Sequence, residues 1–313
     1  MTADVVSLRA PVVCVVGPTA SGKSDLAQAL CVALDGEVVS ADSMQVYRGM
    51  DIGTGKIPVS ERKVPHHGLD LVDPGEPYSA ALYQAYARSC FAEIDARGKR
   101  CVLAGGTGFY VRAAVDDYDF PRGEQVENPV RERYRRFAEE RGAAALWQLL
   151  RERDERSANE VHQNDVKRVI RALELLEEGV SYAQQKENLQ HLGSAVPSVF
   201  VGLSVDPDVL RARIDRRVDR MVAEGLVDEV KTLLNRGFRA GVTAPYAIGY
   251  KEIVSALDGA CTLEEAVEQI KVATHRYAKR QRTWFRKDAR IHWLDADDFD
   301  VDRLCAQALA TLR

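Results

Sequence analysis

The segment Gly17-Pro18-Thr19-Ala20-Ser21-Gly22-Lys23-Ser24 constrains the fold of this chain more than any other. It follows the apolar run at residues 12–16 and precedes a helical pattern at 25–34, so it connects a predicted strand to a predicted helix. Glycines at both ends let backbone N–H groups turn inward, the helix offers its positive N-terminus, and Lys23 adds a charge. This is the pattern of a P-loop, which binds a di- or triphosphate. Ser24 stands where a hydroxyl would ligate the accompanying Mg²⁺.

Composition limits the class of protein. The chain has 313 residues, of which 46% are hydrophobic and 29% charged, which is enough for one large or two modest domains. Its six cysteines are scattered without a C-x-x-C pair, which argues against a zinc site and against a disulfide framework. The sequence shows no export signal and no apolar run of membrane-spanning length. We therefore expect a cytoplasmic protein that has no membrane attachment.

Strand and helix patterns alternate on both sides of a long helical segment. Strand patterns occur at residues 37–40, 100–104, 199–203 and 290–294. Residues 47–77 are rich in Gly and Pro and are predicted to form ordered loops. We predict an α/β fold in which residues 1–118 and 199–313 form a parallel P-loop sheet core with helices on both faces. An all-helical domain, residues 119–198, is inserted into it.

Two polar residues are predicted to follow strands near the P-loop. Asp42 follows the strand at 37–40, and Thr107 follows the strand at 100–104. Ligands of open α/β sheets bind at this edge, so Asp42 is a candidate Mg²⁺ organiser or general base, and Thr107 a candidate donor to phosphate or to a nucleic-acid backbone. Each could instead cap a following helix. The strand at 100–104 does not end in an acid, which argues against an NTP hydrolase.

Arg217 is predicted to lie on the apolar face of a helix that starts near residue 208. Its neighbours on that face are Leu210, Ile214, Val218 and Met221. A buried arginine needs an anionic partner and can bind a phosphate group through two parallel hydrogen bonds. A structural salt bridge to a core carboxylate is the alternative.

A helix predicted at residues 262–287 is basic in its C-terminal half. Lys279 and Arg280 belong to this half, and Tyr277, Trp284 and Phe285 lie among the charges. The combination suits neutralisation of a nucleic-acid backbone and stacking on unpaired bases. A solvated charged face with aromatic residues in the core is the alternative, and it also applies to the arginine runs of the inserted segment.

Taken together, the motifs resemble those of the tRNA dimethylallyltransferases. The P-loop alone would be unspecific, whereas the ordered series is specific and spans nearly the whole chain. Its members are Gly17 to Ser24, Ser40 to Ser43, Tyr47 to Thr54, Gly105 to Thr107, Asn164-Asp165 with Arg168 to Glu174, Ile248 to Glu252, and Tyr277 to Arg286.

The resemblance implies transfer of a dimethylallyl group from dimethylallyl diphosphate to N6 of adenosine 37 of tRNA. Asp42 would accept the N6 proton, while Lys23, Arg217 and Mg²⁺ near Ser24 would stabilise the leaving diphosphate. The expected tRNA contacts are Asp42, Ser43, Met44, Gln45, Thr107, Arg131, His162, Gln163, Asn164, Asp165, Val166, Arg168, Arg171, Lys279 and Arg280. The expected partners are the anticodon stem-loop of tRNA and dimethylallyl diphosphate, and the expected state is a monomer.

Three other functions share part of this pattern. An adenylate isopentenyltransferase would use the P-loop and the aspartate on a free nucleotide, and a small-molecule kinase would use the P-loop with ATP. An RNA-binding module with an inactive P-loop would bind tRNA without forming product. The helical insertion and the basic aromatic helix favour tRNA as the acceptor.

Overall fold

The computed structural model of the chain describes residues 8–120, 128–189 and 192–312. The chain forms two compact units. The sheet unit consists of Met1–Asp116 and Ser194–Arg313, and the helical unit consists of Asp117–Gly193. The boundaries therefore lie a few residues from the predicted ones, because residues 194–198 belong to the sheet unit rather than to the insertion.

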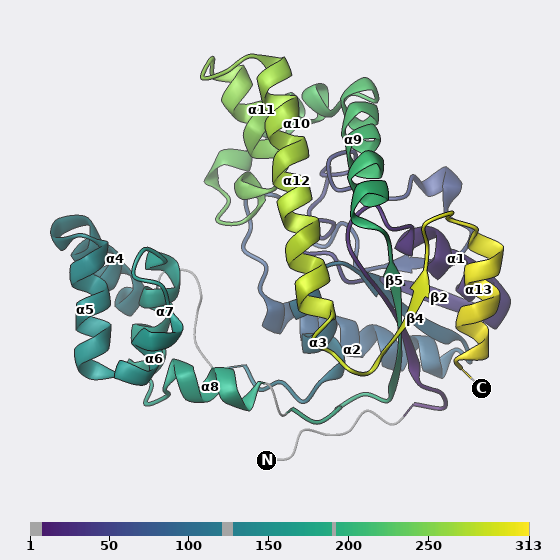
Figure 1. Cartoon of the computed structure of the whole chain (residues 1–313), viewed down its shortest axis with the longest axis horizontal. Coiled ribbons are helices and arrows are strands. Elements are labelled where there is room, and N and C mark those ends of the chain that lie inside the picture. The colour runs from purple at the N-terminus through teal and green to yellow at the C-terminus, as the bar shows by residue number, and fades with distance from the viewer. Residues whose placement is uncertain (1–7, 121–127, 190–191, 313) are drawn as a thin grey trace. The chain divides into compact units, whose positions relative to one another are not determined.

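The sheet unit is built on six strands in the order β3-β2-β4-β1-β5-β6, and every neighbouring pair is parallel (Figure 1). The strands are β1 (Val12–Val16), β2 (Gly36–Ser40), β3 (His66–His67), β4 (Arg100–Gly105), β5 (Ser198–Ser204) and β6 (Ile291–Asp295). All five residues of β1 are buried, which explains why its sequence is a continuous apolar run rather than an alternating one.

Helices cover both faces of the sheet. One face carries α1 (Lys23–Leu34) and α13 (Val301–Ala310), and the other carries α2 (Ala80–Ala96) and α3 (Gly108–Val115) (Figure 1). The connection from β1 to β2 contains α1 and the connection from β3 to β4 contains α2, and the two run in opposite directions along the sheet. Right-handed crossovers therefore place α1 and α2 on opposite faces. The predicted α/β P-loop fold is confirmed.

Four longer helices connect β5 to β6. They are α9 (Pro207–Ala223), α10 (Leu226–Leu234), α11 (Tyr250–Leu257) and α12 (Leu263–Phe285). Short 3-10 turns lie at Val59–Glu61, Phe238–Ala240 and Ala244–Tyr246. Helix α12 packs against α9 and α11 and also against α3, which covers one face of the sheet (Figure 1).

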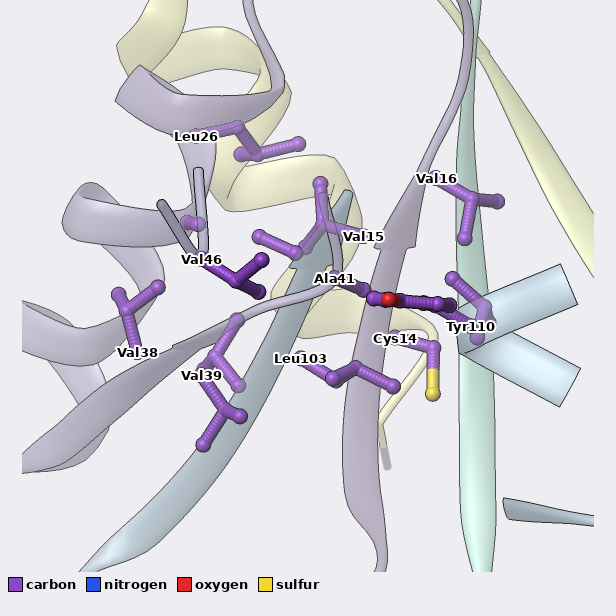
Figure 2. Packing of buried hydrophobic residues seen from close by; sticks show 14 of the residues in the cluster. Cys14, Val15, Val16, Leu26, Val38, Val39, Ala41, Val46, Leu103 and Tyr110 are labelled. Carbon is purple, nitrogen blue, oxygen red and sulfur yellow. The ribbon is translucent and has the colours of Figure 1, made fainter. Parts of the chain in front are cut away.

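The core of the sheet unit forms where β1 and β4 meet the flanking helices. Figure 2 shows Cys14 and Leu103, which are aligned across these two strands, beside Tyr110 of α3. Leu26 of α1 and Val15 lie among the other buried side chains. Burial of these apolar groups stabilises the sheet and thereby fixes the strand ends that carry the polar residues described below.

One strand departs from the prediction of loops over residues 47–77. His66 and His67 form β3, which pairs with Val38 and Val39 of β2. The His67 Nε2 lies 2.6 Å from the Glu37 carboxylate. A strand of two residues within a Gly- and Pro-rich segment has no periodicity that sequence analysis can detect.

The helical unit has its own small core. Its helices are α4 (Pro129–Arg141), α5 (Ala143–Arg153), α6 (Glu155–Glu160), α7 (Val166–Glu177) and α8 (Tyr182–Asn188). Leu146 and Leu150 of α5 pack against Val169 and Leu173 of α7, and all four side chains are buried. In the ranges given above, no helix of either unit combines the length and the apolarity that a membrane span requires.

The chain leaves and rejoins the sheet unit at neighbouring positions. Asp116 and Ser194 form an isolated antiparallel bridge, and the Asp117 N–H donates to the Gly193 carbonyl at 2.9 Å. Asp116 is fully buried and forms an ion pair with Arg290 at 2.6 Å. The two ends of the helical unit are thus joined by backbone hydrogen bonds.

Candidate active site

The P-loop lies between β1 and α1. Gly17 and Gly22 have φ values of 149° and 90°, which residues with a Cβ rarely adopt, and Gly22 directly precedes the first turn of α1. The Lys23 ammonium donates to the Pro18 carbonyl and so closes the loop. Ser24 is exposed at the second position of the helix. The loop therefore opens onto a helix N-terminus, where an anion is stabilised.

Two cations lie close together at this loop. Burial and the neighbouring Arg217 lower the pKa of Lys23 to about 7, and the charge of Asp42 opposes this shift. Burial also lowers the pKa of Arg217, again opposed by Asp42. The positive charge at the loop is therefore not fully balanced, and an anionic ligand would stabilise both side chains.

Arg217 reaches the P-loop from α9. Its Nη1 donates to the Thr19 hydroxyl and its Nη2 to the Thr54 carbonyl, both at 3.2 Å. Among the ion pairs of the described residues, none involves Arg217. The structural salt bridge considered as the alternative is therefore not found.

Asp42 and Thr107 lie at the carboxyl ends of β2 and β4. The Asp42 Oδ1 accepts the Met44 N–H at 2.9 Å, and the Thr107 Oγ1 accepts the Ser43 N–H at 3.1 Å. A turn rather than a helix follows Asp42, so it is not a helix cap. Thr107 occupies the cap position of α3, but its side chain makes no capping hydrogen bond and joins the two strand ends instead.

A cavity of about 290 Å³, called the central cavity below, begins at these groups. Its polar lining includes Thr19, Asp42, Thr54, Arg217 and Arg280. Its apolar lining includes Ile214, Val218, Met221, Ile248 and Ile270, and three tyrosines, Tyr246, Tyr250 and Tyr277, complete the wall. The cavity thus joins a phosphate-binding end to a carboxylate and to an apolar surface.

Helix α12 is fastened to the P-loop by Gln281, which sequence analysis placed in a motif but gave no role. Its Oε1 accepts the Thr19 N–H at 2.8 Å and its Nε2 donates to the Gly106 carbonyl at 2.9 Å. A Cβ on Gly106 would lie 2.2 Å from that Nε2, so glycine is required for this approach. Burial and the charge of Asp42 raise the pKa of the neighbouring Tyr277 to about 12, so it remains a neutral phenol.

The remaining candidate RNA contacts of the sheet unit have different surroundings. Ser43 and Met44 line the central cavity, whereas the Gln45 amide is hydrogen-bonded to the Ser40 hydroxyl and the Thr54 carbonyl. Arg280 lies over the Tyr277 ring at 5.6 Å. The last is Lys279, which is exposed on α12 and lines a separate groove between α9 and α12.

The helical unit holds the other candidate RNA contacts. His162, Gln163 and Asn164 are exposed before α7, Asp165 caps that helix, and Val166 is its first residue.

The three candidate arginines of the helical unit fall into two groups. Arg168 is 66% exposed and forms a surface ion pair with Asp165 at 3.2 Å. Arg131 and Arg171 both bind Glu174, whose side chain is 1% exposed, so these two guanidinium groups have a buried structural partner within the unit. Sequence patterns did not predict this pairing.

Comparisons with known proteins identify the family of the chain. Residues 45–288 match the model of the family described as IPP transferase. The tRNA dimethylallyltransferase of Kocuria rhizophila is 46% identical over 307 residues, covering 96% of this chain and 95% of the relative. That of Carboxydothermus hydrogenoformans is 44% identical over 293 residues, covering 93% of each.

Two solved structures have the same fold. The full-length tRNA isopentenylpyrophosphate transferase from Bacillus halodurans matches with a TM-score of 0.71 and 41% identity, covering 97% of each chain. A eukaryotic dimethylallyltransferase, described as acting on tRNA, matches with a TM-score of 0.79 and 29% identity, covering 96% of this chain and 77% of the other. The family model, the curated relatives and the solved structures thus agree, and the chain belongs to the IPP transferase family.

Proposed function

We propose that the protein transfers a dimethylallyl group from dimethylallyl diphosphate to N6 of the adenosine at position 37 of tRNA, next to the anticodon. The observation that carries this proposal is that one cavity is lined by Thr19 and Arg217, by Asp42 and by apolar side chains. Dimethylallyl diphosphate likewise combines a charged part, the diphosphate, with a short apolar chain. An apolar wall beside the phosphate end suits transfer of that chain.

The P-loop and two cations stabilise the leaving group in this reaction. As the bond between the allylic carbon and the diphosphate oxygen breaks, negative charge develops on the diphosphate. The positive charges of Lys23 and Arg217 are only partly balanced by Asp42, and they would neutralise the charge on the diphosphate. Because Arg217 already donates to the Thr19 hydroxyl, little reorganisation is needed when the anion binds.

Asp42 would orient the acceptor and take its proton. The adenosine N6 attacks the allylic carbon, a C–N bond forms as the C–O bond breaks, and the N6 proton passes to the Asp42 carboxylate. The Asp42 Oδ1 is held by the Met44 N–H, and the carboxylate lines the central cavity. A base inside a stem-loop can reach this depth only when it is extruded from its stack.

The residues present suit Mg²⁺ as the cofactor. Within the described ranges, no group of three or more His, Cys, Asp or Glu residues could hold a metal ion. Ser24 offers one exposed hydroxyl at the N-terminus of α1. Such a poor protein ligand set fits an ion that takes most of its ligands from water and from the diphosphate, and that supplies further charge neutralisation when bound.

RNA binding would draw on exposed cations of both units. Arg168 in the helical unit and Lys279 and Arg280 in the sheet unit are exposed and can neutralise phosphates. We further propose that the protein acts as a cytoplasmic monomer.

The proposal is tested by incubating the protein and Mg²⁺ with dimethylallyl diphosphate and one acceptor, either an anticodon stem-loop RNA or AMP, and in a separate incubation with ATP alone. Mass spectrometry should detect a dimethylallyl increment on the RNA, and the Asp42→Asn variant should lose it. Addition to AMP alone would instead identify an adenylate isopentenyltransferase. Formation of ADP from ATP, with no prenylated product, would identify a kinase.

A further inference from the structure

The segment Asp51–Gly55 overlaps the end of the Tyr47 to Thr54 sequence motif, to which the proposed reaction gives no role. In the structure the backbone N–H groups at its start are bound by Glu229 of α10. The carboxylate accepts three consecutive N–H groups, from Asp51 at 3.1 Å, Ile52 at 2.7 Å and Gly53 at 3.2 Å. A carboxylate that binds three adjacent amides fixes both the position and the direction of the loop.

Tyr250 completes the binding of this carboxylate. Its hydroxyl donates to the Glu229 Oε1 at 2.6 Å, and its ring is fully buried. A Cβ on Gly53 would lie 2.5 Å from that ring, so the loop approaches Tyr250 as closely as a glycine allows. The carboxylate therefore joins α10, α11 and the loop in one hydrogen-bonded cluster.

The other end of the same loop contacts the diphosphate site. The Thr54 carbonyl accepts from Arg217 Nη2 at 3.2 Å and from the Gln45 amide at 3.3 Å. Gly55 has a φ of 64°, and a Cβ there would lie 2.2 Å from the same Arg217 Nη2. The loop therefore forms both a hydrogen-bond acceptor and a steric boundary for the guanidinium.

From these contacts we infer that Glu229 is a positioning residue for the reaction, acting through the Asp51–Gly55 loop to hold Arg217 beside Thr19. The inference rests on the proposed function, because it assumes that Arg217 binds the diphosphate. Arg217 has a long and flexible side chain, and fixing its rotamer before the ligand arrives removes part of the entropic cost of binding. A residue that does not itself line the central cavity would in this way set the affinity for diphosphate.

The test replaces Glu229 by Gln in the full chain. The amide places an N–H donor against backbone N–H groups, so the loop loses its anchor while the side-chain volume is kept. We expect the Kd for inorganic diphosphate, measured by calorimetry without RNA, and the KM for dimethylallyl diphosphate to rise about tenfold, while the KM for the stem-loop changes by less than about twofold. The matched control is Asp228→Asn, an exposed neighbour on α10, which should leave all three values unchanged.

A double-mutant cycle separates positioning from general damage. With Arg217→Ala already present, Glu229→Gln should add less than about twofold to the diphosphate Kd. An equal loss in both backgrounds, or an unchanged Kd in folded Glu229→Gln protein, would overturn the inference. If that variant does not fold, Tyr250→Phe removes one hydrogen bond to the carboxylate and should give a smaller rise that Arg217→Ala again abolishes; no rise in it would equally overturn the inference.

Failure of the proposed function has a different signature. In that case Arg217→Ala would bind diphosphate as the unmodified protein does, or the unmodified protein would form no prenylated RNA. An intact reaction with a large Arg217→Ala effect and no effect of Glu229→Gln would refute only the positioning role.

Discussion

Arg217 donates a hydrogen bond to the Thr19 hydroxyl at 3.2 Å, which joins the middle of α9 to the P-loop across 198 positions of sequence. The contact brings a second cation to a loop that already contains Lys23. It also places that cation in the lining of the central cavity, which Asp42 shares. The consequences of this arrangement can be measured one residue at a time.

Replacing Arg217 by Ala should weaken the use of dimethylallyl diphosphate far more than RNA binding. Loss of a charge-assisted contact costs about 1.5–3 kcal/mol, which corresponds to about 10- to 150-fold in kcat/KM for the diphosphate substrate. Steady-state kinetics with each substrate varied in turn would measure this split. Unchanged kinetics with dimethylallyl diphosphate would rule out the assigned role.

Asp42→Asn should reduce kcat rather than binding. The amide keeps the shape of the side chain and can still accept the Met44 N–H, but it cannot take up the N6 proton. Loss of a general base costs about 10²- to 10⁴-fold in rate. Single-turnover kinetics would measure the rate, and diphosphate and stem-loop affinities serve as controls that should stay within about threefold.

Diphosphate affinity should fall as the pH rises through neutrality. Lys23 has a pKa of about 7 in the free protein, so its protonated fraction decreases from about pH 6 to about pH 8. The charged form binds the anion, and the Kd should therefore rise by up to about tenfold over this range. Calorimetry on Lys23→Met should show a Kd without this Lys23-dependent rise. Titration of the diphosphate itself affects both proteins equally, so the difference between their two pH profiles reports on Lys23 alone. A pH profile identical in the two proteins would contradict the assignment.

Arg168→Ala should weaken stem-loop binding and its dependence on salt. The side chain is 66% exposed and so can reach a phosphate. Binding constants for RNA fall as salt rises, and removal of one phosphate contact should make the plot of log K against log salt less steep by about one. Binding measured by fluorescence anisotropy at several salt concentrations would test this. Arg156, which is 69% exposed in the same unit, provides a matched control that should leave the slope unchanged on substitution by Ala.

Glu174→Gln should destabilise the helical unit. Its buried carboxylate binds both Arg131 and Arg171, and the change leaves two guanidinium groups without their anionic partner. We expect a loss of about 2–4 kcal/mol, since both arginines are only partly buried. Hydrogen exchange of the α7 amides in the full chain would measure it, and the exposed Glu132→Gln on α4 should have little effect.

The sequence predicts the parts of the site that have local signatures. The P-loop follows from glycine spacing between a strand and a helix, and Asp42 from its place after a strand. The apolar face of α9 predicts that Arg217 turns inward, although the pattern alone leaves its partner open. In each of these three cases, hydrophobic periodicity or a glycine indicates the strand, helix or turn that holds the residue.

The rest depends on tertiary contacts that no local pattern encodes. Glu229 is one of two adjacent acidic residues in its helix, yet it binds a loop 178 positions earlier in the sequence. Gln281 carries no charge and no periodic signal, and it is identified only by its bonds to Thr19 and Gly106. The pairing of Arg131 with Glu174 likewise brings together side chains 43 positions apart.

The hydrogen bond between Asp117 and Gly193 has a practical consequence. Because the helical unit starts and ends at adjacent points, it occupies the place of a short surface turn, and a tight linker spans the same gap. The sheet unit by itself contains the P-loop, Asp42 and Arg217, so a chain without residues 117–193 keeps all of these groups. Excision of the helical unit would therefore separate diphosphate binding from any contribution of that unit to RNA binding.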